Sequence, residues 1–303
     1  MDDLRNDSGC SQGARVPIWV TLILWAAKRL PRGGFRIVSV LAGARKELQT
    51  YRISLSLVPH ALFWGDLRLS IFYSLFKFGC YPHQLNEDLV ARTILRKGDV
   101  VYDVGANIGY MTVVYADAVG SGGRVVAFEP SPACCVFLIK NTSYWSTATV
   151  IPKADSDTVG SCMFEEHQCL DLSRVVFGAV QDPSNRVRRV AATTLDDVVS
   201  SGFPAPQFVK IDVEGHELNV FSGARQMLRR HCPVLMFEAF DSRALDACLA
   251  ALKEIAPTEY QFRRVRSSGP LADVYATGSD MTSNYFAIPR WALGRFGALL
   301  NVD

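Results

Sequence analysis

The residues from Val100 to Tyr110 combine a run of β-forming side chains with two spaced glycines and an apolar segment that follows at once. The pattern Asp-x-Gly-x-x-x-Gly, formed by Asp103, Gly105 and Gly109, is typical of a strand, a tight turn and a helix start. α/β folds build nucleotide or nucleoside pockets in this way. A side chain at either glycine would collide with the ligand or with the neighbouring strand. Unpaired N–H groups and the positive end of the helix dipole favour a carboxylate or phosphate here.

The interior of this turn, which contains Ala106 and Asn107, indicates the kind of ligand. A dinucleotide-binding turn has the spacing Gly-x-Gly-x-x-Gly, whose middle glycine lets the backbone approach a pyrophosphate. No glycine lies between Gly105 and Gly109, so that approach is missing. A nucleoside whose small arm carries a carboxylate fits better than NAD, and S-adenosylmethionine is such a ligand. The Asn107 side chain could also cap the helix, which is compatible with ligand contact.

Two further acids follow predicted strands and could bind the same nucleoside. Glu129 ends the strand predicted over 124–128 and is placed, by its spacing from the glycine turn, to accept both ribose hydroxyls. The alternative for Glu129 is a solvated charge at a strand end. Asp155 follows the strand predicted over 148–152 and could accept a hydrogen bond from the adenine amino group, or it could belong to an Asx turn.

The segment from Gln207 to Glu217 is an apolar strand that ends in a dense set of ionisable side chains. Ligands of doubly wound sheets bind outside the carboxyl ends of the strands, so we expect Asp212 to face the same crevice as Gly105 and Glu129. Carboxylates and a histidine that converge there could deprotonate an attacking hydroxyl or hold a divalent cation. A cation is compatible with these residues, but no metal ligand is predicted.

Four ionisable residues of this segment also have a structural interpretation. That interpretation is weakest for Asp212, because an acid that ends a buried strand is costly unless it is used or paired. Lys210 could pair with a neighbouring acid, and Glu214 and Glu217 could stabilise the start of the following helix. Asp212 and His216 are the preferred bases. The predicted catalytic set is Asp212, His216, Glu214 and Lys210.

Predicted strands and helices alternate along most of the chain, which indicates an α/β, doubly wound, mostly parallel sheet with helices on both faces. Glu238 ends one strand near Asp212 and is a secondary candidate for catalysis or metal binding. Residues 158–193 indicate a hairpin insertion. The strands are predicted over 100–104, 124–128, 148–152, 207–211, 233–238 and 283–288.

Residues 1–84 are predicted to form an N-terminal helical extension, and residues 85–303 the main domain. The apolar run 16–27 is shorter than the roughly 20 residues of a membrane-spanning helix, and an acidic leader argues against a secretion signal. Basic residues follow this run, so segment 16–36 could lie on an anionic membrane surface, or it could pack on the core or on a second subunit. Segment 61–78 is too apolar to be exposed and is expected to cover the cofactor pocket.

The composition agrees with one globular domain plus this extension. The chain has 303 residues, of which 49% are apolar, and a net charge of +2, which gives no general attraction to nucleic acid. The eight cysteines form no Cys-x-x-Cys pair and no zinc spacing with the histidines. Buried reduced thiols indicate a reducing compartment. We therefore expect a cytoplasmic protein, with peripheral membrane contact as an open alternative.

Four strings, in this order, resemble the FkbM-type methyltransferases over roughly residues 85–290. The strings are Tyr102-Asp103-Val104-Gly105-Ala106-Asn107-Ile108-Gly109, Phe128-Glu129-Pro130, Thr194-Leu195-Asp196-Asp197 and Lys210-Ile211-Asp212-Val213-Glu214-Gly215-His216-Glu217. The resemblance implies a seven-stranded, Rossmann-like methyltransferase sheet and methyl transfer, commonly to a hydroxyl of a sugar, glycolipid or natural product. Many relatives carry a Glu-Pro pair before the first strand, where this chain has Tyr81-Pro82-His83-Gln84.

We therefore expect an S-adenosylmethionine-dependent O-methyltransferase with a small-molecule or glycan acceptor. The continuation of the strand at Asp212 as Val-Glu-Gly, instead of Asn/Asp-Pro-Pro-aromatic, argues against a nucleic acid substrate. One rival is a nicotinamide-dependent oxidoreductase, which the absent middle glycine disfavours. The other is a non-catalytic membrane-associated protein with a vestigial pocket, which the intact motif set disfavours. The predicted cofactor-binding residues are Asp103, Gly105, Ala106, Asn107, Gly109, Glu129 and Asp155.

Overall fold

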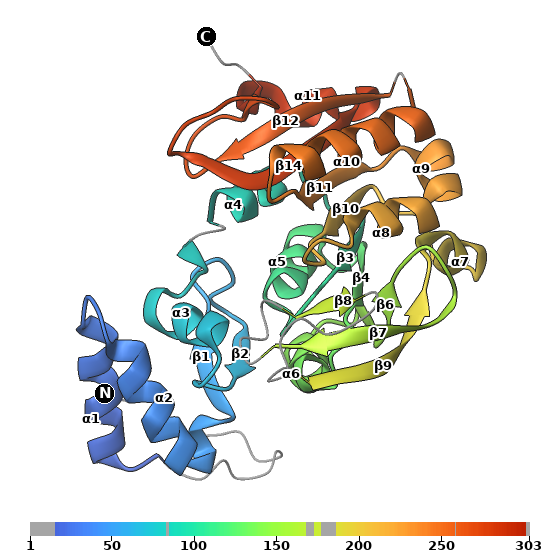
Figure 1. Ribbon diagram of the computed structural model, residues 1–303. Helices are drawn as coiled ribbons and strands as arrows, with labels where there is room; N and C mark the ends of the chain where they lie inside the picture. Colours follow the sequence, from blue (N-terminus) through green and yellow to red (C-terminus); the bar gives the residue numbers. More distant parts are fainter. Residues whose placement is uncertain (1–15, 83–84, 168–172, 177–185, 258, 301–303) are drawn as a thin grey trace.

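The computed structural model describes residues 16–82, 85–167, 173–176, 186–257 and 259–300 (Figure 1). Its main sheet is built from β3 (Val100–Val104), β4 (Arg124–Phe128), β5 (Ala148–Ile151), β10 (Phe208–Ile211), β11 (Val234–Glu238), β12 (Tyr260–Arg266), β13 (Ala272–Asp273) and β14 (Met281–Pro289). The order across the sheet is β13-β12-β14-β11-β10-β3-β4-β5. The run from β11 to β5 is parallel, whereas β14 is antiparallel to both of its neighbours.

This architecture confirms the predicted doubly wound, mostly parallel sheet. The six predicted strands coincide with β3, β4, β5, β10, β11 and β14, with ends that differ by at most two residues. Within the described residues the sheet has eight strands where the resemblance implied seven, and the short strand β13 pairs with the edge of β12. β12 itself was not predicted, because its three arginines interrupt the apolar pattern that marks a strand.

Helices cover both faces of this sheet. Alternate residues of a strand point to opposite faces, and in β3 Val101 packs into one buried cluster while Tyr102 packs into another. The first cluster includes apolar side chains of α4 (Leu85–Ile94) and α5 (Tyr110–Val119), and α6 (Pro132–Thr142) contributes Cys134 to it. The second includes side chains of α7 (Leu195–Ser200), α8 (Glu217–Gly223), α9 (Arg225–His231) and α10 (Ser242–Ile255).

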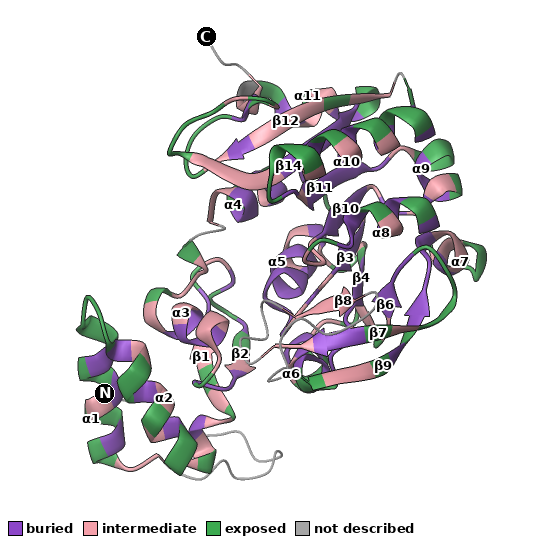
Figure 2. Ribbon diagram, viewed as in Figure 1, coloured by how far each residue is buried: buried purple, intermediate pink, exposed green. Residues whose placement is uncertain are grey.

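The N-terminal segment joins the first of these cores. It contains α1 (Ile18–Arg29), α2 (Gly34–Ala44), the antiparallel hairpin of β1 (Tyr51–Ser54) and β2 (Leu62–Gly65), and α3 (Ser70–Phe78). Val20, Leu24 and Phe72 belong to the same buried cluster as Val114 of α5. Figures 1 and 2 show α1 and α2 at one end of the molecule, with exposed positions along their outer sides. The boundary at residue 84 stays a prediction.

The predicted hairpin insertion is a small separate sheet. Its strands are β6 (Ala154–Asp155), β7 (Gly160–Glu166), β8 (Arg174–Val176) and β9 (Arg186–Thr193), in the order β6-β9-β7-β8. β7 pairs antiparallel with β8 and β9, and β6 lies parallel to β9. Figure 1 places this sheet beside the carboxyl end of β3 and β4, so it can wall a site there.

None of the helices in the described part of the chain combines the length and the apolar character that a bilayer crossing requires. The apolar run at residues 16–27 forms most of α1, a helix of 12 residues. At 1.5 Å per residue this helix is about 18 Å long, well short of a hydrocarbon core of about 30 Å.

Candidate active site

A cavity of about 650 Å³ opens at the carboxyl ends of the parallel strands. This is the edge at which doubly wound sheets bind their ligands, and the volume is in the usual range of small-molecule sites. The sheet contributes residues that follow β3, β4, β10 and β11. Among the predicted site residues, the cavity is lined by Gly105, Ala106, Asn107, Glu129, Asp155, Lys210, Asp212 and Glu214.

The glycine turn after β3 has its shape because the neighbouring strand leaves no room. Gly105 has a φ of +83°, and a Cβ on it would lie 1.9 Å from the carbonyl oxygen of Asp212. The N–H groups of Gly105 and Ala106 both donate to the carbonyl of Phe128, at 3.0 Å. Gly109 has a φ of +91° and faces Leu138 of α6, and it does not line the cavity. A side chain at either glycine would therefore collide with another part of the protein rather than with a ligand.

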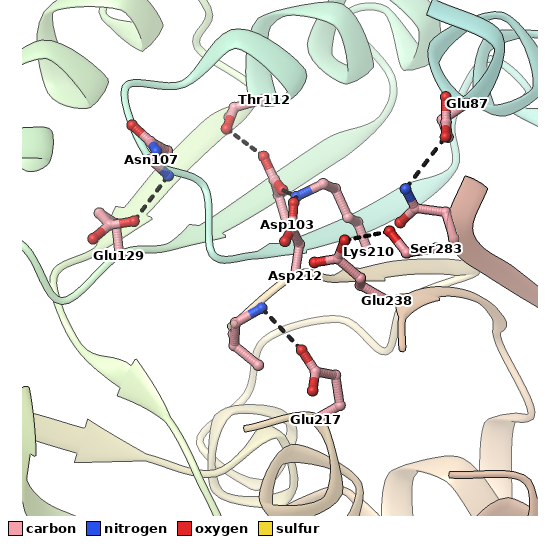
Figure 3. Close-up of polar contacts among 12 residues, drawn as sticks. Glu87, Asp103, Asn107, Thr112, Glu129, Lys210, Asp212, Glu217, Glu238 and Ser283 are labelled. Carbon is pink, nitrogen blue, oxygen red and sulfur yellow. Dashed lines mark hydrogen bonds and ion pairs between the residues drawn. The ribbon is translucent and has the colours of Figure 1, made fainter. Parts of the chain in front are cut away.

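Glu129 is tied to the glycine turn by its carboxylate. Its Oε2 accepts a hydrogen bond from the N–H of Asn107 at 2.8 Å, and its Oε1 accepts one from the N–H of Ser131 at 2.7 Å (Figure 3). Burial raises the pKa of Glu129 to about 7, although both N–H donors lower it. Because each carboxylate oxygen has a second lone pair, Glu129 can also accept from ligand hydroxyls.

Asn107 is not the cap of the following helix. The helix begins after Gly109, and the Asn107 Oδ1 accepts a hydrogen bond from the N–H of Ile108 at 2.7 Å. Asn107 has a φ of +50°, a left-handed conformation that asparagine tolerates better than most residues. The residue therefore bends the turn so that its own N–H points at Glu129.

Asp155 is a buried carboxyl that lines the cavity. It is 3% exposed, and neither of its oxygens has a hydrogen-bond partner. Burial raises the pKa of Asp155 well above its ordinary value, and the charge of Asp196 adds to the effect. A buried polar group without a partner is costly, and such groups in native structures point to a ligand or to water. The alternative of an Asx turn finds no support, because no backbone N–H in the described residues donates to this side chain.

Lys210 lies between two carboxylates, one in the cavity wall and one buried behind it. Its Nζ donates to Oδ2 of Asp212 at 2.9 Å and lies 3.9 Å from Oδ1 of Asp103. Burial alone would lower the pKa of Lys210, but the charges of Asp212 and Asp103 outweigh burial and raise it. Asp103 is fully buried and also accepts a hydrogen bond from Oγ1 of Thr112 at 2.6 Å. Asp103 therefore does not reach the cavity, contrary to its assignment as a cofactor-binding residue.

Three carboxylates gather beside this ion pair. One oxygen each of Asp212, Glu214 and Glu238 lies within 4.8 Å of the others. Glu238, which ends β11, accepts a hydrogen bond from Oγ of Ser283 at 2.5 Å. Burial raises the pKa of Glu238 to about 7, and the charge of Asp212 contributes. In Figure 3, Glu129 lies to one side of the Lys210–Asp212 pair and Glu238 to the other.

His216 does not line the cavity, so the geometry does not favour its prediction as a base. The ring is 2% exposed, and Nε2 lies 2.9 Å from Oγ of Ser156. Burial lowers the pKa of His216, which favours the neutral ring. Glu217 opens α8 and accepts the N–H groups of Val213 and Gly215, at 3.4 and 3.2 Å. Its structural interpretation is therefore confirmed.

Several cavity residues were not predicted, because they lie outside the strand-end motifs. The insertion contributes Phe164 and Arg174, and the expected cover segment 61–78 contributes Ser70 and Ile71. Most of the other large apolar side chains of that segment, such as Phe72, are in the core, whereas Leu62 and Phe78 are exposed. No sequence pattern marks these positions, since their role depends on how the insertion and the extension fold back onto the sheet.

The last strand and α4 supply a second unpredicted group. Asn284 lines the cavity, and its Nδ2 donates to Oε1 of buried Glu87 at 3.2 Å. Burial raises the pKa of Glu87. The chain lacks the Glu-Pro pair that many relatives carry before β3. Two buried acids of α4, Glu87 and Asp88, nevertheless lie close behind the cavity. Of the Tyr81–Gln84 string, Tyr81 lines the cavity, and His83 and Gln84 lie outside the described residues.

Comparison with known proteins identifies relatives of the chain. A hexuronic acid methyltransferase, AglP of Haloferax volcanii, is 32% identical over 149 residues, which cover 47% of this chain and 58% of that protein. The ribosomal RNA large subunit methyltransferase E of Myxococcus xanthus is 25% identical over 178 residues, which cover 56% of this chain and 81% of that protein. The alignment with AglP thus spans little more than half of that relative.

A solved structure is also similar to the chain. The methyltransferase FkbM of Methylobacillus flagellatus is 16% identical, with a TM-score of 0.44, over 88% of this chain and 58% of that one. The methyltransferase FkbM domain model matches residues 103–266, which is more than half of the sequence and runs from β3 through β12. The chain belongs to the FkbM methyltransferase family.

Proposed function

We propose that the protein transfers a methyl group from S-adenosylmethionine to a hydroxyl of a sugar acceptor. The observation that carries the proposal is a single cavity that holds both a nucleoside-type acid pair, Glu129 and Asp155, and a carboxylate cluster that includes Asp212 and Glu238. Family membership supports the methyl transfer. The assignment of an oxygen as the methyl acceptor rests on the carboxylate cluster, since methylation of a hydroxyl requires a group that removes its proton.

The residues of the cavity fit the cofactor. Asp155 offers a buried acceptor without a partner for an exocyclic amino group, and Glu129 offers remaining lone pairs to vicinal hydroxyls. The turn from Gly105 to Asn107 would hold the methionine end. S-adenosylmethionine supplies, when bound, a methyl group on a positively charged sulfonium sulfur. Transfer of the methyl group releases the neutral thioether, which is a good leaving group without assistance. The protein's own task is then to position the acceptor and take up one proton, and positioning alone can contribute about 7–11 kcal/mol.

Glu238 is the best-placed proton acceptor. A general base works best when its pKa lies near the working pH, and burial brings the pKa of Glu238 to about 7. The carboxylate of Asp212 is committed to the Lys210 ammonium, which makes it a weaker competitor for the proton. In this role one Glu238 oxygen takes the hydroxyl proton, while the hydrogen bond from Ser283 orients the carboxyl group.

The acceptor class rests on three observations. AglP, with which the chain shares 32% identity over part of its length, is named for action on a hexuronic acid. The cavity wall opposite the glycine turn also carries polar side chains suited to sugar hydroxyls, namely Thr282, Ser283 and Asn284. Arg174 of the insertion also lines the cavity; its Nε donates to Oε2 of Glu165 at 3.3 Å, and its guanidinium has further N–H groups that can donate to an acceptor carboxylate. We therefore favour an acidic sugar, free or within a glycan.

The decisive test is calorimetric binding of S-adenosylhomocysteine to the full chain. We expect micromolar affinity, at least tenfold weaker in Glu129→Gln and in Asp155→Asn, because each change leaves a buried ligand group poorly paired. Asp246→Asn, at an exposed position of α10, is the matched control and should bind as the wild type does. A folded protein that binds nothing at millimolar ligand would refute the cofactor assignment.

The acceptor is tested separately with S-adenosylmethionine that carries a labelled methyl group. Label should pass to a glucuronic acid glycoside and much less to the matching glucoside. Arg174→Gln should remove most of this preference while it leaves cofactor affinity unchanged. Equal transfer to both glycosides would exclude the acidic sugar class without touching the methyltransferase assignment.

A further inference from the structure

The outer face of α1 is apolar where an ordinary surface helix is polar. Ile18, Leu22 and Trp25 lie on this face at helical spacing and are 81%, 62% and 58% exposed, and Trp19 beside them is 51% exposed. The inner face of the same helix is buried through Val20, Leu24 and Ala27. The helix is therefore apolar on both sides, although only one side is covered within the described residues.

α2 extends this surface. Its inward residues, Val38 and Ala42, are buried, whereas Ile37 and Val40 are 46% and 77% exposed. α1 and α2 pack against each other, and Gly34 permits the contact, since a Cβ there would lie 2.4 Å from the carbonyl oxygen of Ala27. Contiguous exposed apolar residues of this kind mark a binding surface. α10 offers a contrast, because its large apolar side chains are all buried.

Charge on the same segment has a single sign. Residues 16–46 contain six basic residues and no acidic residue, whereas the whole chain has a net charge of only +2, so the remainder is net negative. The basic residues are Lys28, Arg29, Arg32, Arg36, Arg45 and Lys46, of which Arg45 is paired with Glu47, the next residue after the segment, at 3.4 Å. Arginines also lie over the rings of both tryptophans, with Arg29 3.6 Å from the centroid of Trp25 and Arg45 4.9 Å from that of Trp19.

We propose that α1 and α2 dock the protein on the surface of an anionic lipid bilayer. A short helix with exposed tryptophan and aliphatic side chains beside basic residues is typical of segments that lie in the interface plane. Tryptophan is favoured at that depth because its ring is apolar and its N–H is polar. The basic residues would contact the anionic headgroups. A second copy of the chain fits less well, since a symmetric contact through this face would bring the two basic segments together.

The docking surface is connected to the candidate active site through α3. The hydroxyl of Tyr73 donates to the carbonyl of Ala27 in α1 at 3.4 Å, and Nζ of Lys77 donates to the carbonyl of Leu30 at 2.8 Å. At its other end α3 places Ser70 and Ile71 in the cavity wall. One helix therefore joins the lipid-facing surface to the site, which suits an acceptor carried in the membrane; this consequence alone rests on the proposed function.

The test is flotation of the full chain with lipid vesicles, which needs no enzymatic activity. We expect the wild type to float with vesicles of phosphatidylcholine and phosphatidylglycerol, and much less with phosphatidylcholine alone. Leu22→Gln/Trp25→Gln should weaken partitioning at least tenfold. Arg32→Gln/Arg36→Gln should weaken it about 25-fold, since each basic residue near the surface contributes a factor of about five. High salt should act in the same direction.

A matched variant separates this surface from general stickiness. Val136→Gln/Ile139→Gln removes two residues of α6 that are 64% and 54% exposed, and it should float as the wild type does. All four altered apolar positions are exposed, so folding should survive, which circular dichroism checks. Failure of the wild type to float with anionic vesicles overturns the proposal. Flotation of the Leu22→Gln/Trp25→Gln variant equal to that of the wild type also overturns it. A wild type that does not bind vesicles but forms a dimer, which the Leu22→Gln/Trp25→Gln variant dissociates, overturns it as well and assigns the surface to a second copy of the chain.

Discussion

Gly105 and Asp212 follow two adjacent parallel strands, and their backbones meet so closely that no side chain fits between them. A Cβ on Gly105 would lie 1.9 Å from the carbonyl oxygen of Asp212. The contact fixes the position of the glycine turn relative to the residue that carries the Lys210 ion pair. The spacing between the two halves of the cavity is therefore set by the sheet itself rather than by a loop.

The first prediction concerns this contact. Gly105→Ala should lower the free energy of unfolding by about 3 kcal/mol or more, because a positive φ costs about 1–2 kcal/mol and the clash adds a similar amount. Gly43→Ala is the control, since Gly43 lies in α2 with open space where a Cβ would lie, and it should be neutral or stabilising. Urea unfolding measures both, and equal effects would show that the Gly105 contact is not tight.

The second prediction concerns Asp88, which is fully buried and accepts a hydrogen bond from the hydroxyl of Tyr110 at 2.8 Å. Burial raises its pKa from 3.8 to about 7. The folded state thus holds the proton of the Asp88 carboxyl more tightly than the unfolded state does. The contribution of the protonated carboxyl to the free energy of unfolding is therefore fully present below about pH 4 and is lost as the pH rises through 7.

Asp88→Asn keeps the side chain neutral at every pH. Its free energy of unfolding should therefore exceed that of the wild type at pH 8, by roughly 4 kcal/mol at most, and the two should converge near pH 4. Asp246→Asn, at an exposed position of α10, should show no such divergence. A wild type whose stability rises between pH 4 and 8 relative to Asp88→Asn would contradict the sign.

The central part of the site could be predicted from sequence because it follows from strand geometry. Parallel strands bring their carboxyl ends to one edge, so three motifs that each followed a buried strand had to converge. Gly105, Glu129 and Asp212 do line one cavity. The same reasoning needs only the local strand pattern and the rule that ligands bind at this edge.

The positions of the other site residues could not be predicted, because they depend on tertiary packing that no local sequence pattern indicates. Asp103 and Asp212 both lie at the ends of strands, but the pleat turns Asp103 into the core and leaves Asp212 at the cavity. His216 follows Asp212 by only four residues, yet the start of α8 directs it towards Ser156. Arg174 reaches the cavity only because the insertion folds back as its own sheet.

The third prediction tests Glu238 as the base and rests on the proposed function. A base must be ionised to accept a proton, so kcat/KM of the wild type should fall as the pH drops below about 7, the pKa to which burial brings Glu238. Glu238→Gln should lower kcat roughly 10²–10⁴-fold and remove this dependence. The measurement is the pH profile of methyl transfer.

A matched variant makes the assignment specific. The hydrogen bond from Ser283 lowers the pKa of Glu238, so Ser283→Ala should shift the acidic limb to higher pH without abolishing activity. A limb that stays in place in Ser283→Ala, or that persists in Glu238→Gln, would assign the titration to another group.

The fourth prediction asks which partner makes Lys210 necessary. The Lys210 Nζ lies closer to Asp212 than to Asp103, at 2.9 against 3.9 Å, but the Asp103 side chain is 0% exposed and that of Asp212 is 22% exposed. Water can therefore solvate Asp212 when the ammonium is removed, whereas Asp103 would be left as an uncompensated buried charge. Lys210→Met should accordingly cost about 3–5 kcal/mol.

Double variants decide between the two carboxylates. Adding Asp103→Asn to Lys210→Met should restore most of the lost stability, because the amide needs no counterion and can still accept from Thr112. Adding Asp212→Asn should restore much less. Urea unfolding of the wild type, the three single variants Lys210→Met, Asp103→Asn and Asp212→Asn, and the two double variants gives the coupling free energies. If Asp212→Asn is the better rescue, distance outweighs burial here, and the lysine serves the cavity carboxylate rather than the core.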